Sequence, residues 1–299
     1  MEAPLPNQPP EIRTDAFRWP DGSAGWDVLR LDLLHPVVSG NKPFKLAPYL
    51  HRARAEGRPG IATFGGPYSN HIHATAHAAA AAGMPSIGFI RGERPASLSP
   101  TLRDAATWGM QLRFLSREDY RVRSQTASAD DVGCPPGWML IPEGGQGPAG
   151  VAGACTILDG VPHQHYDRIV CACGTGTTAA GLRLTAGHRT TVVGISVLKG
   201  NFGLSRSIRA YADKGPLQVV DGYHFGGYAR ATPELLAFMR RFHSASGIAT
   251  DFVYTAKLMY AVDDLFRKGD FGPKERVLVI HSGGLQGNRS LPDGILADT

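Results

Sequence analysis

Short apolar runs alternate with longer helical segments through most of this chain. Between residues 60 and 117, strands and helices are expected in turn over 60–66, 70–83, 85–92, 97–110 and 111–117. Strands that are connected through helices are typical of a parallel sheet covered by helices. The sequence therefore predicts an α/β protein.

The alternation stops in a segment rich in serine, glycine and proline, residues 124–150, and then resumes. Later strands are expected over 167–174, 190–198 and 276–284, and later helices over 177–187, 233–247 and 256–269. We interpret residues 124–150 as a boundary and predict two α/β lobes, each with three layers built on a mostly parallel sheet. A ligand site is expected at the carboxyl ends of the strands.

The composition is that of a soluble globular protein, with 42% hydrophobic and 19% charged residues among 299. No run approaches the ~20 apolar residues of a membrane span. The N-terminal stretch, residues 1–17, is polar and proline-rich, unlike a secretory signal. These features predict a cytoplasmic protein with no membrane partner.

The formal net charge of +5 is modest, and the arginines are scattered along the chain. No basic stripe interleaves with aromatic residues, as a nucleic-acid surface requires, so no nucleic-acid partner is expected. A solvated surface explains most of the excess charge, and a small anionic substrate or cofactor is the next use for it. The acidic pairs Asp130-Asp131 and Asp263-Asp264 are expected to be solvated.

Metal-ligating residue types are present but poorly arranged for a metal. Cys171 and Cys173 alternate in an apolar run, where a free cysteine behaves as a small hydrophobic residue. His73 and His77 share a helix face, but no glutamate lies between them and no third ligand is evident. We predict no metal site. The two cysteines are interpreted as structural and the two histidines as structural or solvent-facing, with His281 open to either a structural or a site role.

Glycine turns directly follow three apolar strands, in "TFGGPYSN", "CACGTGTTAAG" and "VIHSGGLQG". A glycine turn at a helix N-terminus exposes backbone N–H groups and the positive end of the helix dipole, which suits an anion. The second turn lacks the lysine of a Walker A sequence and the spacing of a dinucleotide fingerprint. With Thr175, Thr177 and Thr178 it is interpreted as a cup for one phosphate monoester, although such a turn is often only structural.

Two of the seven lysines, Lys42 and Lys45, stand three residues apart in "SGNKPFKL", in a chain that otherwise prefers arginine. One lysine can neutralise a phosphate as a point charge. The other can form a Schiff base, which arginine cannot do. Two surface lysines on a loop are the simpler alternative. Together with a phosphate cup, a Schiff-base lysine describes a pyridoxal-phosphate site.

Six motifs in order resemble the 1-aminocyclopropane-1-carboxylate (ACC) deaminase/D-cysteine desulfhydrase family. They are "SGNKPFKL", "FGGPYSNHIHATA", "CACGTGTTAAGL", "YHFGGYA", "VYTAKLMY" and "HSGGLQG", spread over residues 39–287. The resemblance implies pyridoxal 5'-phosphate as cofactor and a tryptophan-synthase-β-like fold, known as fold type II. We then expect a large cofactor-binding domain of residues 1–44 and 148–299, and a small domain of residues 45–147.

The resemblance also implies a role for individual positions. Lys42 matches the Schiff-base lysine, Lys45 the phosphate-contacting lysine, and Gly174, Thr175, Gly176, Thr177 and Thr178 the phosphate loop. Asn70 matches the residue that bonds the ring hydroxyl, and Ser69 with His71 is expected to hold the substrate carboxylate. Tyr228 and Tyr254 match two active-site tyrosines, and all of Lys42, Ser69 and the two tyrosines are candidate catalytic residues.

Two further positions separate the activities within the family. ACC deaminases resemble one another in having a glutamate against the pyridine nitrogen and a leucine in the last glycine turn. This chain has Thr255 and Ser282 there, like the desulfhydrase side of the family. A hydroxyl beside the pyridine nitrogen makes the ring a weaker electron sink than a carboxylate does. Expelling a thiolate needs less stabilisation of negative charge than opening a cyclopropane. Pro43, between the lysines, departs from the larger residue of the family.

The sequence therefore predicts a pyridoxal-phosphate lyase acting on a small amino acid, first D-cysteine, to give pyruvate, sulfide and ammonia. The alternatives are ACC deamination to 2-oxobutyrate and ammonia, and a specialised elimination or replacement on another amino acid. A non-catalytic phosphate-binding protein is the remote alternative. A homodimer is implied by the resemblance alone.

Overall fold

The computed structural model describes residues 12–125, 129–292 and 294–296. Residues 1–11, part of the polar N-terminal stretch considered above, lie outside the described residues. The chain divides into two compact units, which are described separately. Unit 1 contains His35–Val38 and Lys42–Gly153, and unit 2 contains Glu11–Leu34, Ser39–Asn41 and Ala154–Thr299, apart from the residues outside the described ranges.

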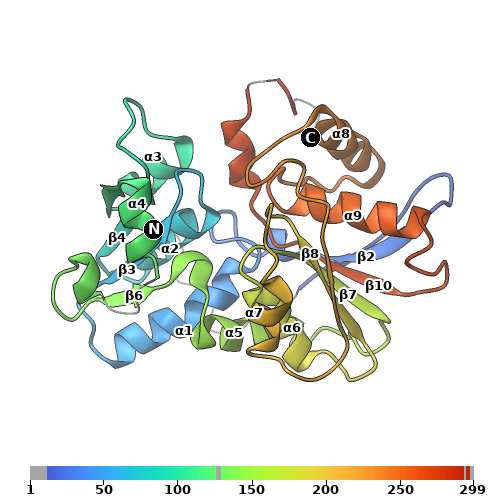
Figure 1. Cartoon of the computed structure of the whole chain (residues 1–299), viewed down its shortest axis with the longest axis horizontal. Coiled ribbons are helices and arrows are strands. Elements are labelled where there is room, and N and C mark those ends of the chain that lie inside the picture. Colours follow the sequence, from blue (N-terminus) through green and yellow to red (C-terminus); the bar gives the residue numbers. More distant parts are fainter. Residues whose placement is uncertain (1–11, 126–128, 293, 297–299) are drawn as a thin grey trace. The chain divides into compact units, whose positions relative to one another are not determined.

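Unit 1 is built on a parallel four-stranded sheet in the order β5-β4-β3-β6 (Figure 1). Its strands are β3 (Ile61–Gly65), β4 (Ser86–Arg91), β5 (Met110–Leu115) and β6 (Met139–Ile141). Its helices are α1 (Lys42–Ala55), α2 (Asn70–Ala81), α3 (Pro100–Thr107) and α4 (Arg117–Arg123), with short 3-10 turns η2 (Asp130–Val132) and η3 (Glu143–Gly145). Every residue of β3 is buried, because helices cover both faces of the sheet.

Unit 2 is built on a six-stranded sheet in the order β1-β2-β10-β7-β8-β9. Its strands are β1 (Thr14–Arg18), β2 (Gly25–Leu29), β7 (Arg168–Cys173), β8 (Thr191–Ser196), β9 (Leu217–Val220) and β10 (Val277–Ile280). Its helices are α6 (Thr177–Thr185), α7 (Leu204–Arg209), α8 (Pro233–Ser246) and α9 (Thr255–Arg267), and α5 (Pro148–Cys155) contains the division between the units. The 3-10 turns are η1 (Leu31–Leu33), η4 (Thr156–Leu158) and η5 (Leu285–Ser290).

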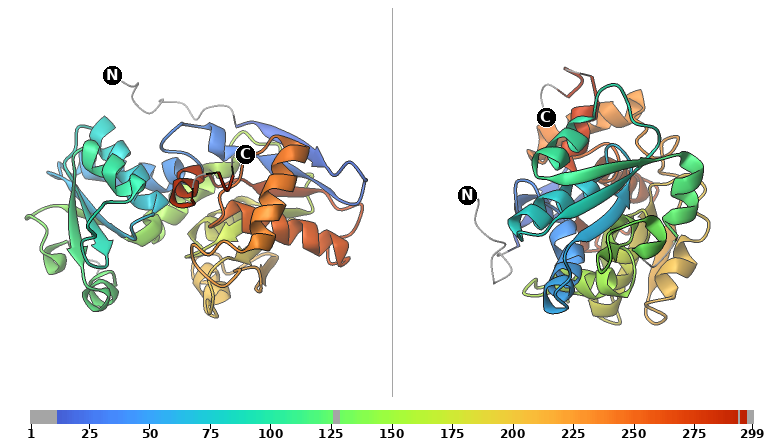
Figure 2. Two further views of the ribbon diagram at one scale, coloured as in Figure 1. Left: turned by 90° about the horizontal axis from the view of Figure 1, so that it is seen from above. Right: turned by 90° about the vertical axis from the view of Figure 1, so that its left-hand side faces the viewer.

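An aromatic core joins one face of the sheet in unit 2 to α8 and α9. Phe17 of β1 and Trp26 of β2 pack on Phe242 of α8, with ring centroids 4.9 and 6.1 Å apart. Figure 2 (left) shows the blue β1–β2 ribbon beside the orange helices. The opposite face is covered by α6, which packs on β7 and β8. Phe238 of α8 and Met259 of α9 are buried in this core.

Two local features differ from the sequence expectations, and a third, the direction of β1, is compatible with the expected mostly parallel sheet. Residues 42–55 form a helix where we predicted none. The two prolines hide the helical pattern in the sequence, but Pro43 lies in the first turn, where a helix tolerates proline. Part of the glycine-rich segment 124–150 belongs to the sheet of unit 1, because β6 pairs with β3. β1 runs antiparallel to β2 at the edge of an otherwise parallel sheet.

Among the described residues, the helices are all too short or too polar to cross a membrane.

Candidate active site

The turn between β7 and α6 has the geometry of an anion site. Gly176 is the N-cap of α6 with φ +81°, so the N-cap residue has no side chain that could bond the first N–H groups. A Cβ at this position would lie 2.8 Å from Cγ1 of Ile208, so the turn requires glycine. Thr175 and Thr177 bring their hydroxyl oxygens within 2.9 Å of each other beside the first turn. Backbone N–H groups, hydroxyls and the helix dipole together suit a phosphate.

Two asparagines fix this turn within unit 2. Asn201 donates from Nδ2 to the carbonyl of Gly174 over 2.9 Å, and Asn41 donates from Nδ2 to Oγ1 of Thr178 over 2.9 Å. The backbone N–H of Asn41 also donates to the carbonyl of Ser282 over 3.3 Å. Asn41 therefore links the loop of Thr178 to the last glycine turn, directly before Lys42 in the chain.

Lys42, Lys45 and His71 lie close together in unit 1. Lys42 is the first residue of α1 and half-buried, and Lys45 is 4% exposed. Burial, helped by the positive charges of Lys42 and Lys45, holds the pKa of His71 well below its usual 6.5. The imidazole of His71 is therefore neutral at physiological pH, beside two amines.

The hydrogen bonds of Thr63 determine which nitrogen of His71 carries the proton. The Thr63 hydroxyl lies 2.8 Å from the carbonyl of Ile141 and 2.8 Å from Nε2 of His71. A carbonyl only accepts, so the hydroxyl donates to Ile141, and Nε2–H of His71 must donate to Thr63. Nδ1 then carries a lone pair, and this buried atom has no hydrogen-bond partner among the described residues. A donor matches this nitrogen better than a carboxylate does.

Ser69 and Asn70 stand at the N-terminus of α2. Ser69 is the N-cap, and its hydroxyl oxygen accepts from the N–H groups of His71 and Ile72 over 3.2 and 3.3 Å. Asn70 is the first helical residue. The predicted residues of the second motif therefore surround one helix terminus in unit 1, close to the pair Lys42 and Lys45 through His71.

The two predicted tyrosines lie together in unit 2. The rings of Tyr228 and Tyr254 meet edge to face, with centroids 6.4 Å apart. A Cβ on Gly174 would lie 3.9 Å from the hydroxyl of Tyr254, so this phenol borders the start of the turn between β7 and α6. Tyr228 is 37% exposed and presents its ring at the surface of the unit.

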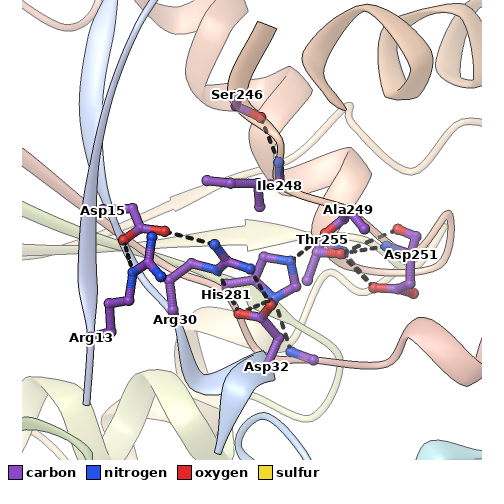
Figure 3. Close-up of polar contacts among 11 residues, drawn as sticks. Arg13, Asp15, Arg30, Asp32, Ser246, Ile248, Ala249, Asp251, Thr255 and His281 are labelled. Atoms are coloured by element: carbon purple, nitrogen blue, oxygen red, sulfur yellow. Dashed lines mark hydrogen bonds and ion pairs between the residues drawn. The ribbon is translucent and has the colours of Figure 1, made fainter. Parts of the chain in front are cut away.

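Thr255 is fully buried, and its hydroxyl is committed to Asp251 (Figure 3). The hydroxyl donates to Oδ1 of Asp251 over 2.7 Å and accepts from the N–H of Asp251 over 2.7 Å. The Asp251 carboxylate also accepts from the N–H groups of Val253, Tyr254 and Thr255, and burial raises its pKa. Towards a further group, the Thr255 oxygen can only accept a hydrogen bond.

A buried polar network anchors the last glycine turn, which contains Ser282. His281 donates from Nε2 to the carbonyl of Ala249 over 2.8 Å, and its Nδ1 lies 3.3 Å from Oδ1 of Asp32 (Figure 3). Arg30 holds the Asp32 carboxylate through two nitrogens, at 2.9 and 2.7 Å. Gly40 packs so closely on this turn that a Cβ there would lie 1.8 Å from the carbonyl oxygen of Ser282. His281 is thus a structural residue next to a predicted site residue.

The expectations about other polar residues have mixed outcomes. His73 and His77 are buried and pack on Trp108, and His73 bonds Asp104 over 3.1 Å. Cys171 and Cys173 are buried and free. No group of three metal-ligating side chains occurs within the part of the chain that the structure describes. Asp263, which we expected to be solvated, is 3% exposed and accepts from Trp19 over 2.7 Å, so that expectation was wrong.

Sequence reasoning did not assign Asn41, Thr63, Asp251 or Lys257, which support the predicted site residues. Lys257 had a visible signal, since a lysine stands between Ala256 and Leu258 on the buried side of an amphipathic helix. The other three are common residue types whose partners lie far away in sequence, as the 137 positions between Asn41 and Thr178 illustrate. No spacing in the sequence could have identified them.

Comparison with known proteins gives consistent matches over almost the whole chain. The family model "Pyridoxal-phosphate dependent enzyme" matches residues 9–283. A Pyrococcus horikoshii protein named "Putative 1-aminocyclopropane-1-carboxylate deaminase" is 31% identical, over 98% of this chain and 91% of that protein. The crystal structure of an ACC deaminase homologue superposes with a TM-score of 0.81 at 29% identity, over 96% of this chain and 93% of that one.

An Arabidopsis thaliana protein named bifunctional D-cysteine desulfhydrase/1-aminocyclopropane-1-carboxylate deaminase, mitochondrial, is 26% identical, over 92% of this chain and 77% of that protein. The chain is therefore a pyridoxal-phosphate-dependent enzyme of fold type II. Within that class it belongs to the ACC deaminase/D-cysteine desulfhydrase family of lyases and deaminases, which confirms the resemblance of the six motifs.

The residues present fit pyridoxal 5'-phosphate. The first turn of α6, which has a glycine as its N-cap and three threonines beside it, would supply donors for a phosphate. Lys42 would supply an amine for the aldehyde, and it lies close enough to His71 for its positive charge to help keep that imidazole neutral. When bound, the cofactor supplies an electron sink that stabilises negative charge at the substrate Cα.

Proposed function

We propose that this enzyme catalyses α,β-elimination on a small amino acid, with D-cysteine and water giving pyruvate, hydrogen sulfide and ammonia. The observation that carries the proposal is the hydroxyl of Thr255 at the position that follows Tyr254. Its hydrogen goes to Asp251, so it offers a neutral acceptor and not a carboxylate. A neutral partner for the pyridine nitrogen leaves the ring a moderate electron sink, which suffices when thiolate leaves directly.

In this proposal Lys42 holds the cofactor through its amine and, once released by substrate, removes the proton from Cα. Lys45 and the loop Gly174–Thr178 bind the phosphate, and Asn70 bonds the ring hydroxyl. Ser69, through its hydroxyl hydrogen, and the N-terminus of α2 hold the substrate carboxylate. The neutral ring of His71 accepts a hydrogen bond from an amine at Nδ1, beside Lys42.

The two tyrosines are proposed to act on the leaving group. Tyr228 and Tyr254 meet edge to face, with ring centroids 6.4 Å apart, and each phenol hydroxyl is a hydrogen-bond donor. Either hydroxyl can donate a proton to the departing thiolate. Ser282, in the same unit, is proposed to contact the substrate. We further propose that residues 1–44 and 148–299 act as the cofactor-binding domain, and that the enzyme is a cytoplasmic homodimer.

A substrate panel tests this function. Purified protein saturated with pyridoxal phosphate is assayed with D-cysteine, L-cysteine, β-chloro-D-alanine and ACC, and 2-oxo acid, ammonia and sulfide are measured. Sulfide and pyruvate in equal amounts from D-cysteine, with no 2-oxobutyrate from ACC, is the expected result. Turnover of ACC alone contradicts the proposal.

ACC deamination is the second candidate, and the names of the relatives favour it. Opening the cyclopropane ring needs stronger stabilisation of charge, which the Thr255 environment supplies less well than a carboxylate does. Equal rates on ACC and D-cysteine would show that Thr255 does not determine which of the two substrates is used. The departure at Pro43 keeps a specialised elimination or replacement on another amino acid as the remaining alternative.

A further inference from the structure

The segment 224–229 of unit 2 has an unusual backbone. Phe225 and Ala229 have φ values of +49° and +52°, and they are the non-glycine residues with positive φ in the described part of the chain. Gly226 and Gly227, between them, have φ values of +91° and +130°. Strained backbone of this kind persists only where surrounding contacts hold it, and it clusters at functional sites.

One side chain supplies such contacts from outside the segment. Lys257 of α9 is fully buried, and its Nζ donates to the carbonyl of His224 over 2.9 Å and to the carbonyl of Gly227 over 2.8 Å. These two carbonyls mark the beginning and the end of the tightest part of the turn. The backbone N–H of Gly227 donates to the same carbonyl of His224 over 2.9 Å.

A charged lysine is energetically unfavourable at this position of α9. Burial lowers the pKa of Lys257 to about 8, against the opposing attraction of the Asp251 carboxylate. The residue also lies in the first turn of the helix, where the dipole disfavours a cation. Because burial and the helix dipole both disfavour the ammonium, the charge of Asp251 and the two hydrogen bonds to segment 224–229 must compensate for them.

These contacts join the two tyrosines through one helix. Tyr254 is the N-cap of α9, and Tyr228 directly follows Gly227, the residue that Lys257 holds. We propose that Lys257 is a positioning residue, which fixes segment 224–229 so that the Tyr228 ring stays against Tyr254. The inference rests on the proposed function, in which both tyrosines contact substrate. Lys257 itself touches neither substrate nor cofactor in this account.

Hydrogen–deuterium exchange tests, without any substrate, whether Lys257 fixes segment 224–229. Holoenzymes of wild type, Lys257→Met and Lys268→Met are compared at the amides of residues 224–230. Lys268 is the matched control, because it is an exposed lysine at the C-terminal end of the same helix, paired with Asp264 over 2.6 Å. We expect exchange to rise about tenfold or more in Lys257→Met and to stay at the wild-type rate in Lys268→Met. Unchanged exchange in Lys257→Met overturns the proposal.

A double-mutant cycle tests the link to Tyr228. We expect Lys257→Met to lower kcat by about 10- to 100-fold through misplacement of the phenol, while cofactor absorbance remains. In a Tyr228→Phe background the same substitution is expected to change kcat less than about twofold, since both changes remove one contribution. An equal loss in both backgrounds shows that Lys257 does not act through Tyr228.

The two experiments separate this proposal from the proposed function. Exchange in segment 224–230 responds to Lys257 whether or not the protein turns over D-cysteine, and the cycle is run with whichever amino acid the substrate panel identifies. If Lys257→Met does not fold, Lys257→Gln replaces it. This variant has a shorter, uncharged side chain and the same expected outcomes. Wild-type exchange in that variant, together with a wild-type kcat, also overturns the proposal.

Discussion

His71 is expected to make this protein lose stability on acidification. Its ring is 2% exposed and has a pKa held well below 6.5. The folded state therefore keeps His71 neutral, whereas the unfolded chain takes up a proton below pH 6.5. When the unfolded state binds more protons, the free energy of unfolding rises with pH, so it falls as the pH drops through this window.

The size of the effect follows from the unfolded pKa alone. If the folded ring stays neutral, lowering the pH from about 7.5 to about 5 costs about 2 kcal/mol, with a slope near 1.4 kcal/mol per pH unit at the acid end. His71→Gln does not titrate and keeps an N–H donor that can reach Thr63. It is therefore the matched variant for this site.

The measurement is urea denaturation of both proteins, at equal cofactor saturation, across that pH range. The difference in the free energy of unfolding between wild type and His71→Gln should shrink by about 2 kcal/mol on acidification. An exposed histidine, His165, provides the control, and His165→Gln should follow wild type within about 0.5 kcal/mol. Parallel curves for wild type and His71→Gln refute the assignment of a neutral, buried ring.

Two other substitutions test the environment of the cofactor. Gly176→Ala should weaken binding of pyridoxal phosphate about tenfold or more in a fluorescence titration, because φ is +81° and the new Cβ meets Ile208 at 2.8 Å. Binding within about twofold of wild type contradicts that geometry. Thr255→Val should lower the free energy of unfolding by about 1–3 kcal/mol, since the buried Asp251 carboxylate loses a donor that lies 2.7 Å away. Thr255→Ser keeps the hydroxyl and should lower the free energy of unfolding less. Equal effects of the two changes at Thr255 argue against a role for the hydroxyl.

Much of the fold could be predicted because local patterns and tertiary contacts agree. Strands such as β3 and β7 are continuous apolar runs, since helices cover both of their faces, and glycine turns mark their ends. The exceptions have local causes. Two prolines conceal α1, and β6 has only three residues within a glycine-rich segment.

The candidate site was less accessible, because its support depends on contacts between distant residues. A preference for arginine made Lys42 and Lys45 conspicuous, and a glycine turn pointed to a phosphate. Nothing in the sequence indicated that Thr63 sets the tautomer of His71. Asp263 was misjudged for the same reason, since its partner Trp19 lies 244 positions away.

The central claim is that Lys42 is the amine that holds the cofactor. The most direct test reduces the holoenzyme with borohydride, digests it and locates the pyridoxyl group by mass spectrometry. The account predicts the label on the peptide that contains Lys42, and no label in Lys42→Ala. A label on Lys45 or Lys257 in the wild-type protein, or unchanged labelling of Lys42→Ala, contradicts it.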